Sequence, residues 1–332
     1  MIETHGLTKH FTSGKQTVEA VRGIDLTVGH GEMVALLGPN GAGKSTTLRM
    51  LTTLIAPTSG TATVAGHDVT GHPRRVRSQI GFIGQGNGAG HQQRGRDELI
   101  TQGRAYGLSR SDSRVRADEL IDSLDLAAVA DRKVMTLSGG QRRRLDIAMG
   151  LIHAPELLFL DEPSTGLDPQ NRANLQEHIV RLRERFGTTV VLTTHYLDEA
   201  DSLAERVVVV DHGTVVADDT PQQLKAELGG DQLTLRFVSA EIASVAANRI
   251  DAEPAARVIC AGERVEVRAT NGTELLPRLI GDLANAGIAV LAADVSRPTL
   301  DDVFLGLTGH SLREGHSAID TNFANDRQEV AA

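Results

Sequence analysis

A glycine-rich loop between an apolar run and a helical stretch limits this chain to a small set of folds. Residues Gly38 to Thr46 read GPNGAGKST and match the pattern GxxxxGK[ST]. An apolar run at residues 33–37 precedes this phosphate loop, and residues 45–54 follow it with helical character. A strand, such a loop and a helix in that order are typical of α/β proteins that bind phosphate. The sequence therefore predicts an α/β fold with a nucleotide phosphate at the start of the helix.

The residue types of the phosphate loop suit the chemistry of a phosphate group. Glycine adopts backbone angles that are closed to other residues, so the N–H groups of the loop can point at phosphate oxygens. The helix that starts near Gly43 adds the positive end of its dipole. Lys44 would neutralise the β- and γ-phosphates, and the Ser45 hydroxyl would be a Mg²⁺ ligand. The predicted nucleotide-binding residues are Gly38, Pro39, Asn40, Gly41, Ala42, Gly43, Lys44, Ser45 and Thr46.

A second apolar run ends in two acids. Residues 157–160 read LLFL, which is typical of a strand buried on both faces of a parallel sheet, and Asp161 and Glu162 follow them. Ligands of open α/β sheets collect at the carboxyl ends of strands, so both acids should lie at the phosphate site. Asp161 would hold Mg²⁺, directly or through water. Glu162 would polarise the attacking water as a general base, with a solvated loop acid as the alternative.

A third motif, LSGGQ at residues 137–141, precedes another helical stretch; we refer to it as the signature. Its small residues expose N–H groups at a helix N-terminus, which is a second anion site. Together with Gln85, Asp168 and His195, the three motifs resemble, in order and spacing, the nucleotide-binding domain of ABC ATPases over about residues 1–225. In that family the signature of one subunit closes on the γ-phosphate held by the other subunit. The resemblance implies ATP and Mg²⁺ as cofactors and a second ATPase subunit, identical or homologous, as a partner.

The resemblance also assigns roles to single residues. Gln85 matches the glutamine that reaches Mg²⁺ and the attacking water, and His195 matches the histidine that contacts the γ-phosphate. Phe11 matches the aromatic residue that stacks on adenine, with a core phenylalanine as the alternative. Asp168 matches the loop that touches the partner subunit. The signature residues expected at the nucleotide are Ser138, Gly139, Gly140 and Gln141. The predicted catalytic residues are Glu162, His195 and Gln85, and the predicted metal ligands are Ser45, Gln85 and Asp161.

The stretch after Gln85 departs from the family pattern. Residues 86–91 read GNGAGH, and a run so rich in glycine is flexible and has no fixed turn type. In the family this loop couples ATP to the membrane partner. The resemblance therefore assigns a role to Gln85 but leaves the coupling geometry of this chain open.

Charge and apolar content exclude several classes of protein. The chain of 332 residues has a net charge of −9, which is a poor match to nucleic-acid binding, so no nucleic-acid partner is expected. Its most basic short run, residues 142–144, is expected to be a solvated helix face beside the signature. A single cysteine, Cys260, excludes an internal disulfide. No apolar run approaches the ~20 residues that span a bilayer, and the N-terminus lacks the pattern of a signal peptide. We therefore expect a peripheral protein at the cytoplasmic face of the membrane.

Two domains and a tail are expected along the chain. Residues 1–228 would form the ABC nucleotide-binding domain, with a helical insertion at about residues 92–150. Its first part, residues 2–37, alternates like a small antiparallel sheet that turns at residues 29–31. Residues 155–217 alternate strands and helices, which is the pattern of a parallel core sheet. These strands include residues 188–193 and a hairpin at 205–218 that turns at His212 and Gly213.

The C-terminal part predicts a second, smaller α+β domain over residues 231–309. Its order is βαββαβ, the ferredoxin-like pattern, with strands at 231–238, 257–260, 265–268 and 288–295 and helices at 241–250 and 273–285. This fold serves many functions, so a dimerisation or packing module and a small-molecule sensor both remain open. Residues 310–332 are polar without a periodic apolar pattern, and we expect them to be disordered.

A subfamily resemblance narrows the function. Residues 297–309, RPTLDDVFLGLTG, resemble the C-terminal motif of the daunorubicin/doxorubicin-resistance ATP-binding subunits, and residues 142–146 and 196–201 also resemble that subfamily. This implies the ATP-hydrolysing subunit of an exporter of antibiotics or other amphiphilic compounds, which powers a separate transmembrane permease. Two alternatives remain: an importer ATPase whose C-terminal domain senses the substrate, and an ABC ATPase without a transport role.

Overall fold

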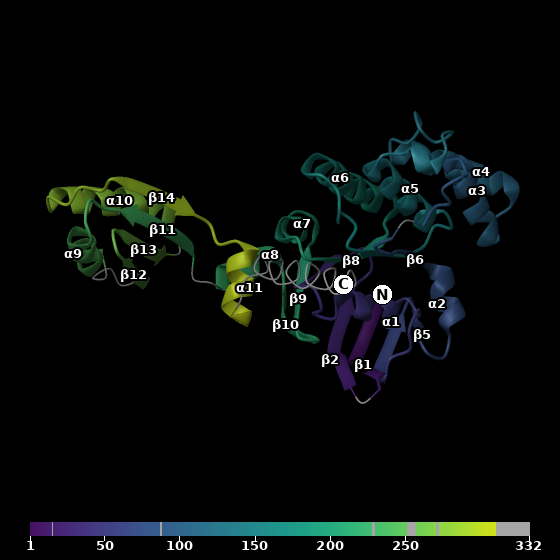
Figure 1. The fold of residues 1–332 in the computed structure, drawn as a ribbon, viewed down its shortest axis with the longest axis horizontal. Coiled ribbons are helices and arrows are strands. Elements are labelled where there is room, and N and C mark those ends of the chain that lie inside the picture. Colours follow the sequence, from purple (N-terminus) through teal and green to yellow (C-terminus); the bar gives the residue numbers. More distant parts are fainter. Residues whose placement is uncertain (15, 87, 228–229, 251–256, 270–271, 310–332) are drawn as a thin grey trace, which may run out of the picture. The chain divides into compact units, whose positions relative to one another are not determined.

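The chain divides into two compact units, residues 1–220 and 221–332 (Figure 1). The computed structural model describes all residues except 15, 87, 228–229, 251–256, 270–271 and 310–332. The expected disorder of residues 310–332 therefore concerns a segment outside the described residues. Helix α8 (Pro221–Glu227) belongs to the second unit, where it packs against α11 (Leu300–Thr308).

A six-stranded sheet forms the centre of the first unit. Its order is β10-β9-β3-β8-β7-β6, and all neighbours are parallel except the hairpin β9-β10. Every residue of β3, β7 and β8 is buried, which explains why these strands are continuous apolar or threonine-rich runs. The predicted strands and the hairpin at His212 and Gly213 are confirmed. The bounds are β3 Met33–Leu37, β6 Ile80–Ile83, β7 Leu157–Asp161, β8 Thr189–Thr194, β9 Arg206–Asp211 and β10 Thr214–Asp219.

A four-stranded sheet with the order β2-β1-β4-β5 stands beside the central sheet. The predicted antiparallel sheet is confirmed for β1 and β2, but residues 33–37 do not belong to it, because the turn at residues 29–31 leads out of this sheet and into β3 of the parallel sheet. Buried and exposed residues alternate in the second half of β2, whereas β3 is covered on both faces. The bounds are β1 Ile2–Ser13, β2 Gln16–Val28, β4 Ser59–Val64 and β5 His67–Asp68.

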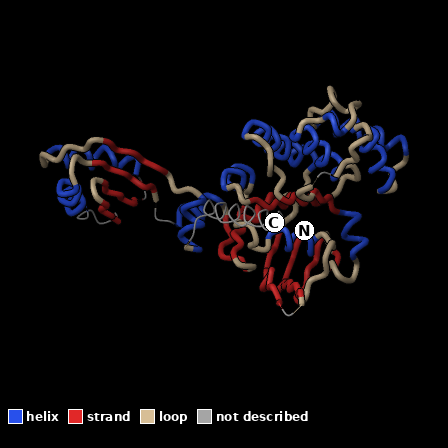
Figure 2. Tube along the Cα trace, viewed as in Figure 1, coloured by secondary structure: helices blue, strands red, loops and turns tan. Residues whose placement is uncertain are grey.

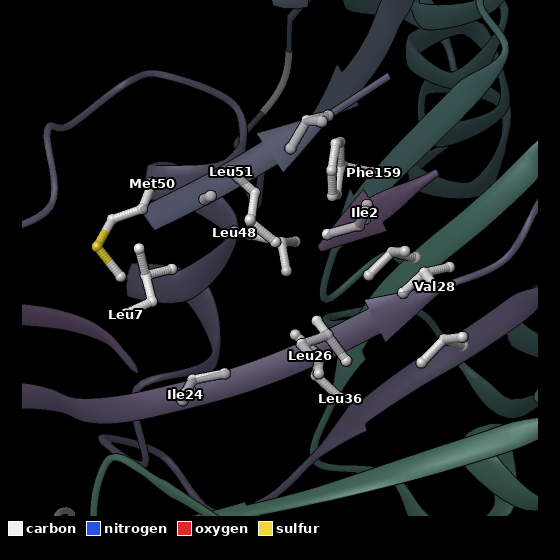
Figure 3. Close-up of a cluster of buried hydrophobic side chains, with 14 of the residues drawn as sticks. Ile2, Leu7, Ile24, Leu26, Val28, Leu36, Leu48, Met50, Leu51 and Phe159 are labelled. Carbon is white, nitrogen blue, oxygen red and sulfur yellow. The ribbon is translucent and has the colours of Figure 1, made fainter. Parts of the chain in front are cut away.

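One hydrophobic core joins the two sheets and holds helix α1 (Lys44–Leu51) between them (Figure 3). Leu48 of α1 packs in this core with Leu26 of β2 and Phe159 of β7, and all three side chains are buried. Burying a side chain of this kind contributes about 1.5–3 kcal/mol. The helix is thus anchored on both sides, and the phosphate loop before it has a fixed position.

Helices α3, α4 and α5 form the expected insertion, and Figure 2 shows helices gathered on the side of the parallel sheet that faces away from the antiparallel sheet. Helices α3, α4 and α5 pack on one another, and α5 also packs on α6. Among the described residues, no helix is long and apolar enough to cross a membrane. The bounds are α2 Pro73–Gln79, α3 Gly95–Ala105, α4 Arg110–Ser123, α5 Gly139–Leu151, α6 Pro169–Phe186 and α7 Leu197–Leu203, with a 3₁₀ turn at Val134–Thr136.

The second unit contains the predicted βαββαβ module. Its antiparallel sheet has the order β12-β13-β11-β14. The last strand begins at Ala292 rather than at residue 288, because Ile288 and Val290 pack on the core of the module without pairing as a strand. The bounds are β11 Asp231–Arg236, α9 Ala240–Ile250, β12 Arg257–Ala261, β13 Arg264–Ala269, α10 Gly272–Asn285 and β14 Ala292–Ser296.

Candidate nucleotide-binding site

The phosphate loop connects β3 to α1 and is pressed against neighbouring backbone. Gly43 caps α1 with a φ of +102°, in the region that favours glycine. A Cβ atom on Gly43 would lie 2.5 Å from the carbonyl oxygen of Ala20, and one on Gly38 would lie 2.1 Å from that of Val210. The glycines at both ends of the loop are therefore required by packing against β2 and β9, as well as by any phosphate.

Lys44 supplies a buried positive charge inside the loop. Its Nζ donates to the carbonyl oxygens of Gly38 at 2.7 Å and Pro39 at 2.9 Å. It also lies 3.9 Å from Oε1 of Glu162. Burial lowers the pKa of Lys44, while the nearby carboxylates of Glu162 and Asp161 act in the opposite direction. The ammonium group is thus held beneath the loop, where the phosphates of a nucleotide would need it.

The predicted metal ligands lie together at the carboxyl end of β7. Ser45 Oγ donates to Asp161 Oδ1 at 2.7 Å, and Gln85 Nε2 lies 3.5 Å from Ser45 Oγ. Thr193 Oγ1 of β8 donates to the same oxygen of Asp161 at 2.7 Å. A hydroxyl, a carboxylate and an amide oxygen are the hard ligands that Mg²⁺ prefers, so this donor set fits that ion once the Gln85 amide is turned to present Oε1 in place of Nε2.

Glu162 follows β7 in a strained backbone conformation. Its φ is +47°, which is unusual for a residue with a side chain. The backbone N–H donates to Thr193 Oγ1 at 3.0 Å. The side chain is 10% exposed, with Oε2 3.4 Å from His195 Nδ1 and accepting a hydrogen bond from Thr165 Oγ1 at 3.1 Å. The alternative of a solvated loop acid therefore does not hold.

The charge state of Glu162 suits a proton acceptor. The hydrogen bond with His195 is the largest cause that lowers the pKa of the Glu162 carboxyl group, and it outweighs the opposing effect of burial. Lys44 and Thr165 lower the pKa further. The group is therefore ionised at neutral pH, as a general base must be.

A pocket of about 680 Å³ opens over these residues, within the usual size range of small-molecule sites. It joins the phosphate loop to Gln85, to Glu162 and to the strand β2. The lining residues are Val18, Glu19, Ala20, Arg22, Asn40, Gly41, Gly43, Lys44, Ser45, Thr46, Gln85, Glu162 and His212.

Phe11 lies beside the wall of this pocket. It pairs on β1 with Val18 of β2, which lines the pocket. The ring is 44% exposed, and Lys9 Nζ lies 5.2 Å from its centroid. Because a core phenylalanine would be buried, that alternative is excluded, and an aromatic face remains available to a base.

The signature and Asp168 lie at the starts of two other helices. Ser138 caps α5, with its Oγ accepting from the N–H of Gln141 at 3.3 Å and its own N–H donating to Gln141 Oε1 at 3.0 Å. Asp168 caps α6 through the N–H of Asn171 at 2.9 Å. Neither the signature nor Asp168 is among the described residues that line the pocket.

Three functional candidates were missed from the sequence: Thr193, Arg143 and Asp146. The prediction that residues 142–144 form a solvated helix face is wrong for Arg143, which is 8% exposed because backbone carbonyls surround its guanidinium. Asp146 is 4% exposed on the same face of α5. The spacing of Arg143 and Asp146, one helical turn apart, was the signal that they share a face.

Known proteins resemble this chain over most of its length. Residues 21–165 match the ABC transporter family. The chain is 44% identical to the daunorubicin/doxorubicin resistance ATP-binding protein DrrA of Streptomyces peucetius, over 93% of this chain and 92% of the relative. It is 33% identical to the linearmycin resistance ATP-binding protein LnrL of Bacillus subtilis, over 95% and 100%. A solved dimeric ATP-binding cassette with ADP and phosphate is 27% identical with a TM-score of 0.61, over 66% of this chain and 98% of that one.

Proposed function

This chain belongs to the ABC transporter family as an ATP-hydrolysing subunit of the exporter kind, and we propose that it powers the export of antibiotics or other amphiphilic compounds through a separate transmembrane permease. The observation that supports hydrolysis is the meeting of Lys44, Ser45, Asp161, Glu162 and His195 at the carboxyl ends of neighbouring parallel strands. The drug-resistance names of its relatives support the class of cargo. The chain would act at the cytoplasmic face of the membrane.

Each residue of the site has a role in this proposal. Lys44 and the loop N–H groups bind the β- and γ-phosphates, and Ser45, Asp161 and Gln85 hold Mg²⁺. The bound ion would supply positive charge that offsets the negative charge of the phosphates. Glu162 takes the proton of the attacking water. His195 holds the carboxylate of Glu162 and faces the γ-phosphate.

The signature would complete the site of a second subunit. In the described part of the chain, the signature lies at the start of α5 and outside the pocket that holds the phosphate loop. The N–H groups at the N-terminus of a helix can bind an anion, and the signature would bind a phosphate that is held by another subunit. Two copies, or this chain and a homologue, would therefore bind two nucleotides between the phosphate loop of one and the signature of the other.

The first test compares Glu162→Gln with the wild-type chain. Loss of the general base should slow hydrolysis of Mg·ATP by roughly 10²–10⁴-fold, while ATP binding measured by fluorescence titration stays close to that of the wild type. Glu177→Gln is a matched control, since Glu177 is 71% exposed and pairs with Arg181 on its own helix. Near-normal turnover by Glu162→Gln would remove Glu162 from its role.

A second test addresses the shared site. Ser138→Arg should leave ATP binding to the monomer intact and should abolish ATP-dependent dimers in size-exclusion chromatography. Ser109→Arg is the control, because Ser109 also caps a helix and accepts from the N–H of Asp112 at 3.1 Å. Both variants lose about 1 kcal/mol of cap stabilisation. Dimers that survive Ser138→Arg would refute the shared site.

The proposed association with a permease is tested by affinity purification of the tagged chain from its own membranes in mild detergent. A polytopic partner that lacks an ATPase cassette of its own would support the transport role, and its substrate would define the cargo. Recovery of soluble partners alone would favour an ABC ATPase without a transport role.

A further inference from the structure

Two buried charged side chains of α5 hold the segment that carries Gln85. Arg143 Nη1 donates to the carbonyl oxygen of Gly84 at 2.7 Å. One turn later, Asp146 Oδ1 accepts from the N–H groups of Gly88 at 3.0 Å and Ala89 at 3.2 Å. Gln85 therefore lies between two points that are both attached to one turn of α5.

The same arginine also reaches the segment after β7. Arg143 Nε donates to the carbonyl oxygen of Pro163 at 2.8 Å, and Nη2 donates to that of Asp161 at 3.3 Å. A guanidinium carries donors in a fixed fork, so it can hold two backbone segments at a set distance. Arg143 thus connects α5 with the backbone on both sides of the candidate metal site.

This arrangement differs from the flexible loop that the glycine-rich run predicts. Gly88 and Ala89 are the described residues whose N–H groups are fixed by Asp146, and a Cβ atom on Gly88 would lie 3.4 Å from Asp146 Oδ1. Such a Cβ atom would be in ordinary van der Waals contact, and Ala89 carries one beside the same oxygen, so the attachment does not require glycine. The glycine-rich run is therefore compatible with a fixed attachment at Gly88 and Ala89.

Burial of this pair carries a free-energy cost that a role in the site would explain. Asp146 and Arg143 are both almost fully buried, and Oδ2 of Asp146 has no hydrogen-bond partner among the described residues. Burial raises the pKa of the Asp146 carboxyl group, and the Gly88 and Ala89 N–H groups oppose this. A well-packed apolar pair is often at least as stabilising as buried charges, so stability alone does not account for their presence.

We propose that Arg143 and Asp146 are positioning residues that attach the Gln85 segment to the helix of the signature. Because Ser138 caps the same helix, a displacement of the signature would move Gln85 relative to Ser45 and Asp161. Closure of a signature on a nucleotide would thereby be transmitted to the metal site of its own chain. This inference rests on the proposed function, since it concerns the geometry of the hydrolytic site.

The kinetic test is a double-mutant cycle between Asp146→Ala and Gln85→Ala. Asp146→Ala should lower kcat on the order of 10-fold with little change in the KM for Mg·ATP. In the Gln85→Ala background, the same substitution should cost less than about 2-fold, because residues that act through one another are not additive. An equal loss in both backgrounds, or no loss in either, would overturn the proposal.

Conservative and control variants separate positioning from folding. Asp146→Asn keeps an oxygen that can accept from Gly88 and Ala89, so it should restore most of kcat. Arg144→Gln is the control on the same helix, because Arg144 Nη1 donates to the carbonyl oxygen of Leu124 instead. It should keep kcat near that of the wild type. A loss of kcat with Arg144→Gln equal to that with Asp146→Ala would contradict a specific role of Asp146.

Hydrogen exchange gives a readout that does not depend on catalysis. The peptide that contains Gly88 and Ala89 should exchange faster in Asp146→Ala than in the wild type, and at the wild-type rate in Asp146→Asn. If Glu162→Gln keeps normal turnover, the proposed function fails, whereas the exchange rates still decide whether Asp146 holds the segment. Unchanged exchange in Asp146→Ala would overturn the attachment itself.

Discussion

The hydroxyl of Thr193 provides a direct test of how the hydrolytic site is held. Thr193 is fully buried on β8, opposite Asp161 in the register of the sheet. Its Oγ1 donates to Asp161 Oδ1 at 2.7 Å and accepts from the N–H of Glu162 at 3.0 Å. A single side chain therefore fixes the candidate metal ligand and the backbone of the candidate base. Thr193→Val keeps the shape of the side chain and removes both bonds.

The loss of free energy of unfolding follows from these two bonds. A hydrogen bond to a charged group contributes about 1.5–3 kcal/mol, and a neutral one about 0.5–1.5 kcal/mol. The N–H of Glu162 also lies 3.2 Å from the carbonyl oxygen of Thr193, so it keeps a partner. The expected loss is therefore about 2–4 kcal/mol. For a unit of this size the Tm should fall by roughly 5–15 °C.

The effect on turnover follows from the backbone of Glu162. A residue held in the left-handed region stores about 1–3 kcal/mol of strain, which relaxes when its support is removed. Relaxation would carry the carboxylate away from Lys44 and His195. Since a displacement of about 1 Å can cost about 10²-fold in rate, we expect kcat to fall by roughly 10- to 100-fold. The KM for ATP should change less, because the phosphate loop is untouched.

Thermal unfolding measures the expected fall in Tm. Steady-state hydrolysis, at a temperature where every variant is folded, measures the expected fall in kcat. Thr193→Ser retains the hydroxyl and should behave like the wild type. Thr189→Val is the control on the same strand, where Oγ1 accepts from the N–H of Gly31 at 2.9 Å. It should lower the Tm without lowering kcat. The reasoning is refuted if Thr193→Val loses stability but keeps wild-type kcat, or if Thr189→Val loses as much kcat as Thr193→Val.

Two further predictions concern the edges of the site. His195→Ala removes the main cause that lowers the pKa of Glu162, so that pKa should rise. Because the base must be ionised, the acid limb of the pH profile of kcat/KM should move to higher pH; an unchanged limb would show that another group sets it. Phe11→Ala should raise the KM for ATP about 5-fold or more by loss of base stacking. It should leave the Tm unchanged, since the ring is 44% exposed, and a large drop in Tm would instead indicate a core role.

The central site was predictable because its parts obey rules of parallel sheets. Residues 33–54 contain a strand, a loop and a helix in one short stretch, so no long-range information was needed. Asp161 ends β7 and His195 follows β8, its parallel neighbour, and the carboxyl ends of such strands lie at one edge of the sheet. The contact between Ser45 and Asp161 at 2.7 Å is the outcome of that rule.

The sequence did not predict the hydrogen bonds of Arg143, because its partners are backbone carbonyl groups whose positions depend on the fold. Arg143 belongs to a run of three arginines that reads as solvated surface. Its burial depends on the carbonyl oxygens of Gly84, Asp161 and Pro163, which come together only in the folded chain. The turn at residues 29–31 was assigned to the wrong sheet for a similar reason, because alternation within a strand does not identify its pairing partner.

The signature residues have a local role as a helix cap and a proposed role at the nucleotide of another subunit. The capping box between Ser138 and Gln141 explains these two residues without any nucleotide, and the cap of Asp168 on α6 is equally complete. A capping box, however, satisfies only part of the N–H groups that the first turn of a helix leaves without an intrahelical partner. Ser138 and Gly139 are exposed, while the face of α5 behind them is buried. Gly140 is buried, and a Cβ atom on it would lie 2.7 Å from Asn171 Oδ1, so packing explains this glycine, whereas Gly139 leaves the start of the helix open to solvent. In the proposed shared site, the exposed start of α5 would receive an anion from another subunit, and this is why Ser138→Arg and Ser109→Arg should differ although both remove a cap.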